Sequence, residues 1–285
     1  MNAARPYRQM PLNRLIGGGL IAVILVAAII GAIWTPYDPL ALDIKSRLQA
    51  PSAAHLLGTD EFGRDVLSRI LAGASTSVWI SFVVVVCTIA FGSAVGVATG
   101  YLRGWADHLA MILNDTLLAF PGILLALGLM AVIGPGSGGI TFALTIAYVP
   151  SVVRVVRGVV LSLREREFIE ASLVIGNSQL YTMWRHILPN CIAPITVLAT
   201  ALFGWALLTE SALSFLGLGV PPPAPTWGNM LAASRPFFGN APWLGIFPGL
   251  CICMALLGTN LFGDVVRDWF DPRMARVKRP AEATP

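Results

Sequence analysis

The chain has very few charged residues for its length, and this scarcity excludes an ordinary soluble globular protein. Only 12% of its 285 residues are Asp, Glu, Lys or Arg, whereas globular domains carry about 25%. Hydrophobic residues make up 56%, and the mean hydropathy is positive. A surface so poor in charge needs lipid around most of it. The composition therefore predicts an integral membrane protein that lies in a lipid bilayer.

Catalytic and nucleotide-binding motifs are also missing from the sequence. There is no Gly-x-x-x-x-Gly-Lys-Ser/Thr phosphate loop, so we do not expect this chain to bind and hydrolyse ATP in the usual way. No His-Glu-x-x-His motif occurs, and the three histidines, His55, His108 and His186, are scattered. No interleaved aromatic and basic pattern suggests nucleic acid as a partner. We therefore expect no enzyme, and any energy source must lie on another chain.

The four cysteines carry no signature of a metal site. Cys87, Cys191, Cys251 and Cys253 all fall in apolar stretches, where a free thiol behaves as a small hydrophobic group. Cys251 and Cys253 form a Cys-x-Cys pair, but no cluster of His or carboxylate residues accompanies them. The sequence therefore predicts no metal and no other cofactor bound by this chain.

Six apolar windows are long enough to cross a membrane, given that about 20 residues of helix span the hydrocarbon core. They lie at about 13–34, 77–102, 109–133, 140–162, 188–213 and 243–263. The first window is longer than a signal peptide's apolar core and no small-x-small site follows, which favours an uncleaved anchor. We expect Pro121 to kink the third helix and the glycine-rich run 134–139 to form a tight turn. The predicted fold is all-α, with six transmembrane helices.

Basic residues predict the orientation of these helices in the membrane. With six spans, fourteen Lys and Arg residues fall on the side that holds both termini and the region 154–187. Five fall on the other side: Lys45, Arg47, Arg64, Arg69 and Arg235. Cytoplasmic loops carry the excess of positive charge. We therefore expect both termini to be cytoplasmic, and the net charge of +4 is a topology signal.

The most informative stretch interrupts the apolar pattern between the fourth and fifth windows. Residues 164–176 read Arg-Glu-Arg-Glu-Phe-Ile-Glu-Ala-Ser-Leu-Val-Ile-Gly, and Ile-Leu-Pro-Asn follows at 187–190. Because apolar segments flank it, this polar insert must leave the bilayer as a compact helix-turn-helix. Gly176 supplies the freedom in φ that the reversal needs. The first helix is predicted to carry an apolar stripe made of Phe168, Ile169, Leu173 and Val174.

The insert resembles the Glu-Ala-Ala loop of permease subunits of ATP-binding-cassette (ABC) importers. The residues that fall on positions of that motif are Glu170, Ala171, Gly176, Leu188 and Pro189. The sequence departs from the motif at Ser172, where the family usually has Ala, and at His186, where Ile is commonest. In that family the loop docks in a groove of a nucleotide-binding subunit, whose closure on ATP moves the permease from inward-open to outward-open. The resemblance thus implies that these residues couple this chain to an ATPase.

Two further stretches resemble one group of these importers, which carry dipeptides, oligopeptides or nickel. The run 57–73, Leu-Gly-Thr-Asp-Glu-Phe-Gly-Arg-Asp-Val-Leu-Ser-Arg-Ile-Leu-Ala-Gly, resembles the N-terminal signature of the group's second permease subunit. Its pattern predicts a turn and then an amphipathic helix that lies along the membrane interface. The run 210–230 resembles the external loop after the fifth span, and its prolines predict a stiff external ledge. The resemblance covers roughly residues 10–275.

The resemblance implies the type I ABC importer permease fold with a cytoplasmic coupling helix-turn-helix. It implies a permease subunit that moves di- or oligopeptides across the bacterial cytoplasmic (inner) membrane. The implied partners are a second homologous permease, two nucleotide-binding ATPase subunits that hold ATP and magnesium, and an external substrate-binding protein. The expected segments are 1–76, with the first span and an external part, 77–270, the core permease domain, and 271–285, a basic cytoplasmic tail.

Two carboxylates inside the predicted spans are candidates for the transport path, because charged residues in spans face protein or water. Asp115 lies one or two turns inside the third window, and a structural hydrogen bond or a basic partner competes there with a substrate role. Glu210 lies near the outer end of the fifth window, where a peptide's amino terminus would need an anion. Small residues of the second window predict a wide, wet path: Gly92, Ser93, Gly96 and Gly100.

Three other functions stay open at this point. An importer of nickel or another small solute would need gathered metal ligands, and Met111, Met130 and Met254 keep that alternative alive. A carrier coupled to protons or ions would need relays of ionisable groups inside the membrane, for which Asp115 and Glu210 are a thin basis. A membrane enzyme would need a catalytic constellation that the sequence does not show.

Overall fold

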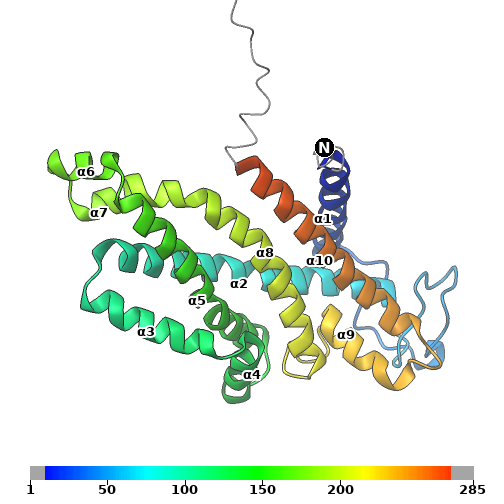
Figure 1. Cartoon of the computed structure of the whole chain (residues 1–285). Helices are drawn as coiled ribbons and strands as arrows, with labels where there is room; N and C mark the ends of the chain where they lie inside the picture. Colours follow the sequence, from blue (N-terminus) through cyan, green and yellow to red (C-terminus); the bar gives the residue numbers. More distant parts are fainter. Residues whose placement is uncertain (1–9, 271–285) are drawn as a thin grey trace, which may run out of the picture.

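The computed structural model describes residues 10–270, and those residues form a bundle of helices without a β-strand (Figure 1). The long helices are α1 (Met10–Ile33), α2 (Val66–Leu102), α5 (Ser137–Arg164), α8 (Leu188–Phe215) and α10 (Trp243–Phe270). The shorter helices are α3 (Trp105–Ala119), α4 (Gly122–Ile133), α6 (Glu167–Val174), α7 (Gln179–Thr182) and α9 (Trp227–Ser234). The predicted basic tail, 271–285, and residues 1–9 lie outside the described residues.

Within residues 10–270, five helices are long and apolar enough to cross a membrane, and one broken pair of helices adds a sixth span if the pair is counted as one span. The chain is therefore a multi-pass membrane protein, as its composition predicts. The broken pair is α3 and α4, whose axes differ by 93°. Pro121 has no N–H to continue a helical ladder, and Phe120 before it has an extended backbone. The kink predicted at Pro121 is confirmed, and it is sharp enough to divide the helix.

The second helix is much longer than its predicted window. α2 runs unbroken through 37 residues, which gives it a length of about 55 Å, well beyond a hydrocarbon core of about 30 Å. The turn and the helix predicted within 57–73 are both present, but the helix is the beginning of α2, which continues in one direction, rather than a helix that lies along the membrane interface. The predicted boundary between residues 76 and 77 also falls inside this helix. Four polar residues at the start of α2 and just before it, which an interfacial helix would turn toward water, are buried: Arg64, Asp65, Ser68 and Arg69.

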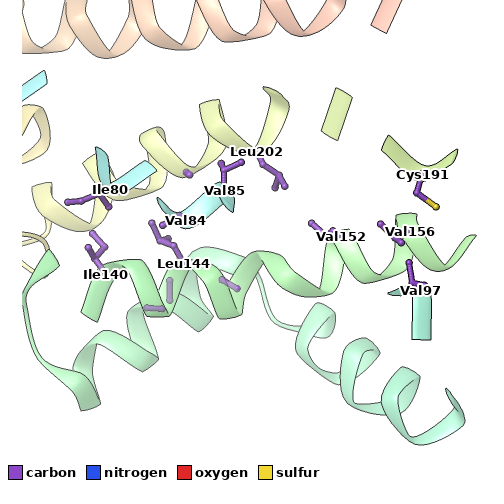
Figure 2. Packing of buried hydrophobic residues seen from close by; sticks show 14 of the residues in the cluster. Ile80, Val84, Val85, Val97, Ile140, Leu144, Val152, Val156, Cys191 and Leu202 are labelled. Carbon is purple, nitrogen blue, oxygen red and sulfur yellow. The ribbon is translucent and has the colours of Figure 1, made fainter. Parts of the chain in front are cut away.

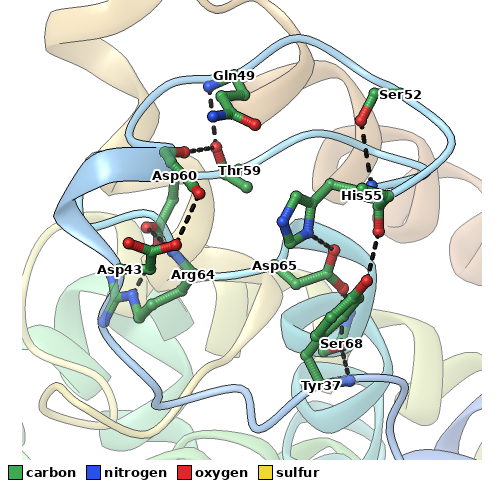
Figure 3. Close-up of polar contacts among 12 residues, drawn as sticks. Tyr37, Asp43, Gln49, Ser52, His55, Thr59, Asp60, Arg64, Asp65 and Ser68 are labelled. Atoms are coloured by element: carbon green, nitrogen blue, oxygen red, sulfur yellow. Dashed lines mark hydrogen bonds and ion pairs between the residues drawn. The ribbon is translucent and has the colours of Figure 1, made fainter.

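These polar residues are buried because they bind one another beneath a cap of loops, residues 34–65, which we call the loop cap (Figure 3). Asp65 caps α2 by accepting hydrogen bonds from the Ser68 N–H and hydroxyl, at 2.8 and 2.7 Å. Its other carboxylate oxygen lies 2.9 Å from His55 Nδ1. The carboxylate of Asp60 accepts from Arg64 Nε at 2.6 Å and lies 3.4 Å from Arg69 Nε. A buried charge needs such partners, and here it has them.

The largest core cluster lies between α2, α5 and α8 (Figure 2). Three glycines of α2 allow the close approach of α5: Gly92, Gly96 and Gly100 lie against Val152, Val156 and Val160. A Cβ on Gly96 would lie 2.9 Å from the Cβ of Val156. The prediction that these glycines widen a transport path is therefore wrong. They form a small-residue seam that lets two helix backbones pack closely.

The remaining elements close the other side of the bundle. α1 packs against α10 and α2, and α10 packs against α8 and α9. Trp227 of α9 is buried, and its indole N–H donates to the Ile70 carbonyl of α2 at 3.1 Å. Asn229 donates to the carbonyls of Val220 and Ala224, at 3.3 and 2.8 Å, and so fastens the proline-rich run to α9.

Candidate functional site

The polar insert forms a hairpin of two short helices, as predicted. We call residues 165–187 the polar hairpin. Its first helix is α6, its second is α7, and a π-helical turn (Met183–Ile187) leads from α7 directly into α8. The polar hairpin and the loop cap lie at opposite ends of the molecule (Figure 1). Both α5 and α8 run into the hairpin, so two membrane-crossing helices share it.

The reversal of the hairpin depends on Gly176, whose φ of +92° lies in the left-handed region. The Gly176 N–H donates to the Leu173 carbonyl at 3.0 Å, and the Asn177 N–H donates to the Ser172 carbonyl at 3.2 Å. This pair of bonds is a Schellman motif, which satisfies the last carbonyls of α6. No atom lies within 4 Å of a Cβ added at Gly176, so backbone conformation alone requires glycine.

Ser172, which departs from the usual motif residue, binds the two helices of the hairpin together. Its side chain is buried, and its hydroxyl lies 3.1 Å from the hydroxyl of Thr182 in α7. The Asn177 amide also donates to the Ser172 hydroxyl, at 3.1 Å. An alanine has no hydroxyl to make these bonds. The departure therefore has a structural role in this hairpin.

The tip of the hairpin presents apolar side chains to its surroundings. Val174 is 87% exposed and Ile175 is 80% exposed. Further exposed apolar side chains of the hairpin are Phe168, Leu173, Leu180, Tyr181 and Trp184. Of the stripe predicted on the first helix, only Ile169 turns inward. Such a patch outside the long helices is typical of a surface that binds another protein or a membrane.

The other predicted coupling residues lie on the hairpin or at its exit. Glu170 and Ala171 are exposed on α6, where the negative charge of Glu170 suits the first helical turn. The His186 ring meets the Tyr181 ring edge-on, with centroids 5.8 Å apart. Leu188 donates its N–H to the Met183 carbonyl, which closes the wide π-helical turn just before Pro189. Five of the seven predicted coupling residues thus lie in the polar hairpin, and Leu188 and Pro189 begin α8 at its exit.

Asp115 has a basic partner in the structure, which is one of the alternatives to a substrate role that the sequence allowed. Its carboxylate accepts from Arg154 Nη2 of α5 at 2.7 Å, and both side chains are about three-fifths exposed, at 61% and 62%. The sequence reasoning missed a second pair between the same helices, Asp107 with Arg157. The signal for it was two arginines one turn apart in an otherwise apolar window, because such residues share a helix face.

Glu210 lies inside the bundle, away from any surface. Its side chain is fully buried in α8, and its carboxylate accepts from the Ser214 hydroxyl at 2.8 Å and the Ser211 hydroxyl at 3.3 Å. Both serines belong to α8, so the carboxylate is bonded within its own helix, and α2 packs against that helix. A contact with a passing substrate would require the surrounding helices to separate.

The sequence matches the model of one protein family, described as binding-protein-dependent transport system inner membrane component, over residues 92–276. The match begins inside α2 and includes the broken pair, the polar hairpin and α10. More than half of the chain lies within it, which is enough to assign the family.

Curated relatives extend the similarity over nearly the whole chain. A dipeptide transport system permease protein of Alkalihalophilus pseudofirmus is 43% identical over 270 residues, which cover 94% of this chain and 89% of that protein. A putative peptide transport system permease protein of Brucella suis is 42% identical, with 91% of this chain and 87% of the relative covered. A di/tripeptide transport system permease protein of Pseudomonas aeruginosa is 40% identical, with 91% and 88% covered.

Proposed function

Because this chain belongs to the family of binding-protein-dependent transport system inner membrane components, we propose that it is the peptide-carrying permease of an ABC importer. Together with a second, homologous permease it forms the path for di- or oligopeptides across the bacterial cytoplasmic membrane. The names of the relatives, which specify peptides, dipeptides and di/tripeptides, support this substrate class. The chain itself is a transport subunit. Two partner ATPases supply the energy with ATP and magnesium, and an external binding protein delivers the peptide.

The polar hairpin carries this proposal, because hydrogen bonds join its two helices and its apolar tip is exposed. A short helix laid in a groove of an ATPase subunit buries such a tip. Any displacement of the hairpin is passed to α5 and α8, which run into it. The residues that couple the two chains in this account are Glu170, Ala171, Ser172, Gly176, His186, Leu188 and Pro189.

The proposed orientation places the hairpin and both termini in the cytoplasm and the loop cap outside. The asymmetry of basic residues supports it. The separation of the hairpin and the loop cap to opposite ends of the molecule fits the same arrangement (Figure 1). The loop cap and the proline-rich run then face the external binding protein.

The transport path is proposed to involve Asp115 and Glu210 in different ways. Asp115 is exposed beside Arg154, so a peptide or its water shell can reach this ion pair directly. Glu210 is fully buried and bonded to serines of its own helix, so it becomes accessible only if the helices packed around α8 move apart. Both carboxylates are therefore assigned to the transport path. Asp115 faces the path in the described conformation, and Glu210 faces it only after helices separate.

Copurification of the ATPase subunits tests the hairpin directly. We expect the double variant Val174→Asp/Ile175→Asp to insert in the membrane and to lose the ATPase subunits, because charge on the tip opposes burial in an apolar groove. The matched control is Leu42→Asp/Ile44→Asp, which charges two exposed apolar residues of the loop cap. The control should keep its ATPase subunits. Retention of the ATPase by the hairpin variant would show that the tip is not the docking surface.

A further inference from the structure

Helix α3 is a rod with a change of direction at each end. At its start, Arg103 and Gly104 both have positive φ, at +56° and +84°, and they turn the chain out of α2. At its end, the break at Pro121 sets α3 and α4 at 93°. A helix bounded in this way is positioned mainly by its sideways contacts.

Those sideways contacts are polar. The buried side chains of α3 are Asp107 and Asn114, while apolar residues such as Trp105, Leu109 and Leu113 are exposed. Met111, Leu117 and Leu118 are half-buried, so no apolar side chain of α3 is fully enclosed in the bundle. The ion pairs that link α3 to α5 therefore help to fix its position.

The pair Asp107–Arg157 is the more specific of these links. Arg157 Nε donates to Asp107 Oδ1 and Nη2 donates to Oδ2, both at 2.8 Å. This two-pronged geometry fixes distance and orientation together, which a single contact does not. The side chains of Arg157 and Asp107 are 26% and 11% exposed, so water screens the pair only partly. The Asp115–Arg154 pair has one bond and is largely exposed.

Helix α5, which carries Arg157, leads into the polar hairpin through a very short connection. Arg157 lies two turns before the end of α5, and Glu165 and Arg166 alone separate that end from α6. The guanidinium of Arg164 lies 5.9 Å from the centre of the Tyr101 ring of α2. Ile169 and Ile187 of the hairpin belong to the same core cluster as Tyr101 of α2 and Val160 of α5, so the base of the hairpin packs with these two helices. α3 is attached to α5 through its ion pairs.

We propose that Asp107 and Arg157 are positioning residues, which carry a displacement of the polar hairpin through α5 to α3 and so to the bend at Pro121. The inference rests on the proposed function, because it assumes that an ATPase moves the hairpin. In this account the pair holds the inner half of the broken span in register with α5. When the pair is lost, the ATPase subunits still hydrolyse ATP, but α3 and α4 no longer move with α5.

The test is the amount of dipeptide transported per ATP hydrolysed by the complete complex in proteoliposomes. For Asp107→Asn we expect this ratio to fall about tenfold, the usual effect of losing a hydrogen-bonded ion pair. Arg157→Lys keeps the charge but not the two-pronged geometry, so its ratio should fall less. The exchange Asp107→Arg/Arg157→Asp should restore much of the ratio. A folding defect would instead lower transport and hydrolysis together.

The control is Asp264→Asn, which removes an exposed carboxylate of α10 outside the contact between α3 and α5 and should change the ratio by less than about twofold. An unchanged ratio in both Asp107→Asn and Arg157→Lys overturns the inference, as does an equal loss in Asp264→Asn. If Asp107→Asn does not assemble, Arg157→Lys and the exchange decide the result. A wild-type complex without an ATPase subunit would contradict the proposed function instead.

Discussion

At the scale of single residues, the polar hairpin depends on the positive φ of Gly176 and on the hydroxyl of Ser172. The sequence predicted the glycine, because a chain reversal between two short helices requires freedom in φ at Gly176. It did not predict the role of Ser172, since the bond to Thr182 exists only after α6 and α7 have folded against each other. Asp107 and Arg157 were missed for the same reason, because the two residues are 50 positions apart.

We expect Gly176→Val to abolish ATP-driven transport while the external protein still captures peptide. A β-branched residue at positive φ costs about 1–3 kcal/mol of strain, enough to weaken docking several-fold to a hundredfold. The control is Gly158→Val, since Gly158 lies in α5 with open space around it and an ordinary helical φ. Peptide uptake by both variants is compared at equal complex content. Normal uptake by the Gly176 variant would show that the hairpin does not couple ATP hydrolysis to transport.

Ser172→Ala should loosen the hairpin without unfolding the protein. Thr182 keeps a bond from its hydroxyl to the Ser178 carbonyl at 3.2 Å, so the change leaves no orphaned group there. The expected loss is about 0.5–1.5 kcal/mol of local stability. Hydrogen–deuterium exchange of the α6 amides measures it, with the amides of α9 as an internal reference. Equal protection of the α6 amides in the wild-type protein and the variant would mean that the bond between Ser172 and Thr182 does not stabilise the hairpin.

At the scale of elements, the apolar windows located the membrane-crossing helices but not their lengths. α2 begins at Val66, eleven residues before its predicted window, because its polar first turn is buried under the loop cap. A window of hydropathy cannot anticipate buried ion pairs such as Asp60 with Arg64. The glycines of α2 were misread for a related reason. Small residues suit both a wide path and a close helix contact, and only the position of α5 distinguishes the two.

The glycine seam makes a prediction about stability. Gly96→Ala should destabilise the chain by about 1–3 kcal/mol, the usual cost of forcing extra volume into a packed interface. The new Cβ would lie 2.9 Å from the Cβ of Val156 and 3.0 Å from the Val153 carbonyl oxygen. Gly128→Ala in α4 is the control, because no neighbour lies within 4 Å of its added Cβ. Thermal unfolding in detergent compares the two, and equal midpoints would argue against a tight seam.

At the scale of the whole molecule, the six-span prediction agrees with five long helices and one broken pair. The sequence alone also identified the permease family, since three separated motifs carry the resemblance. The broken geometry of the third span was predicted only as a kink. Its 93° angle depends on how α4 packs against α5, which the residues around Pro121 do not determine by themselves.

The proposed topology predicts which positions a membrane-impermeant thiol reagent reaches in intact cells. On a background without the four native cysteines, a cysteine at position 45 or 235 should be labelled from outside. A cysteine at position 176 should be labelled only after the membrane is opened. The basic asymmetry gives this expectation its physical basis. Labelling of position 176 in intact cells would reverse the orientation and refute the placement of the hairpin.

The central claim is that the polar hairpin couples ATP hydrolysis by a partner to movement of a peptide through this chain. Uptake of a labelled dipeptide into proteoliposomes, with ATP inside and the external binding protein outside, measures it most directly. Wild-type complex should accumulate the peptide only when ATP is present, and Glu170→Lys should lower uptake at least about tenfold with peptide capture unchanged. ATP-independent uptake, or normal ATP-driven uptake by the Glu170 variant, would contradict the account.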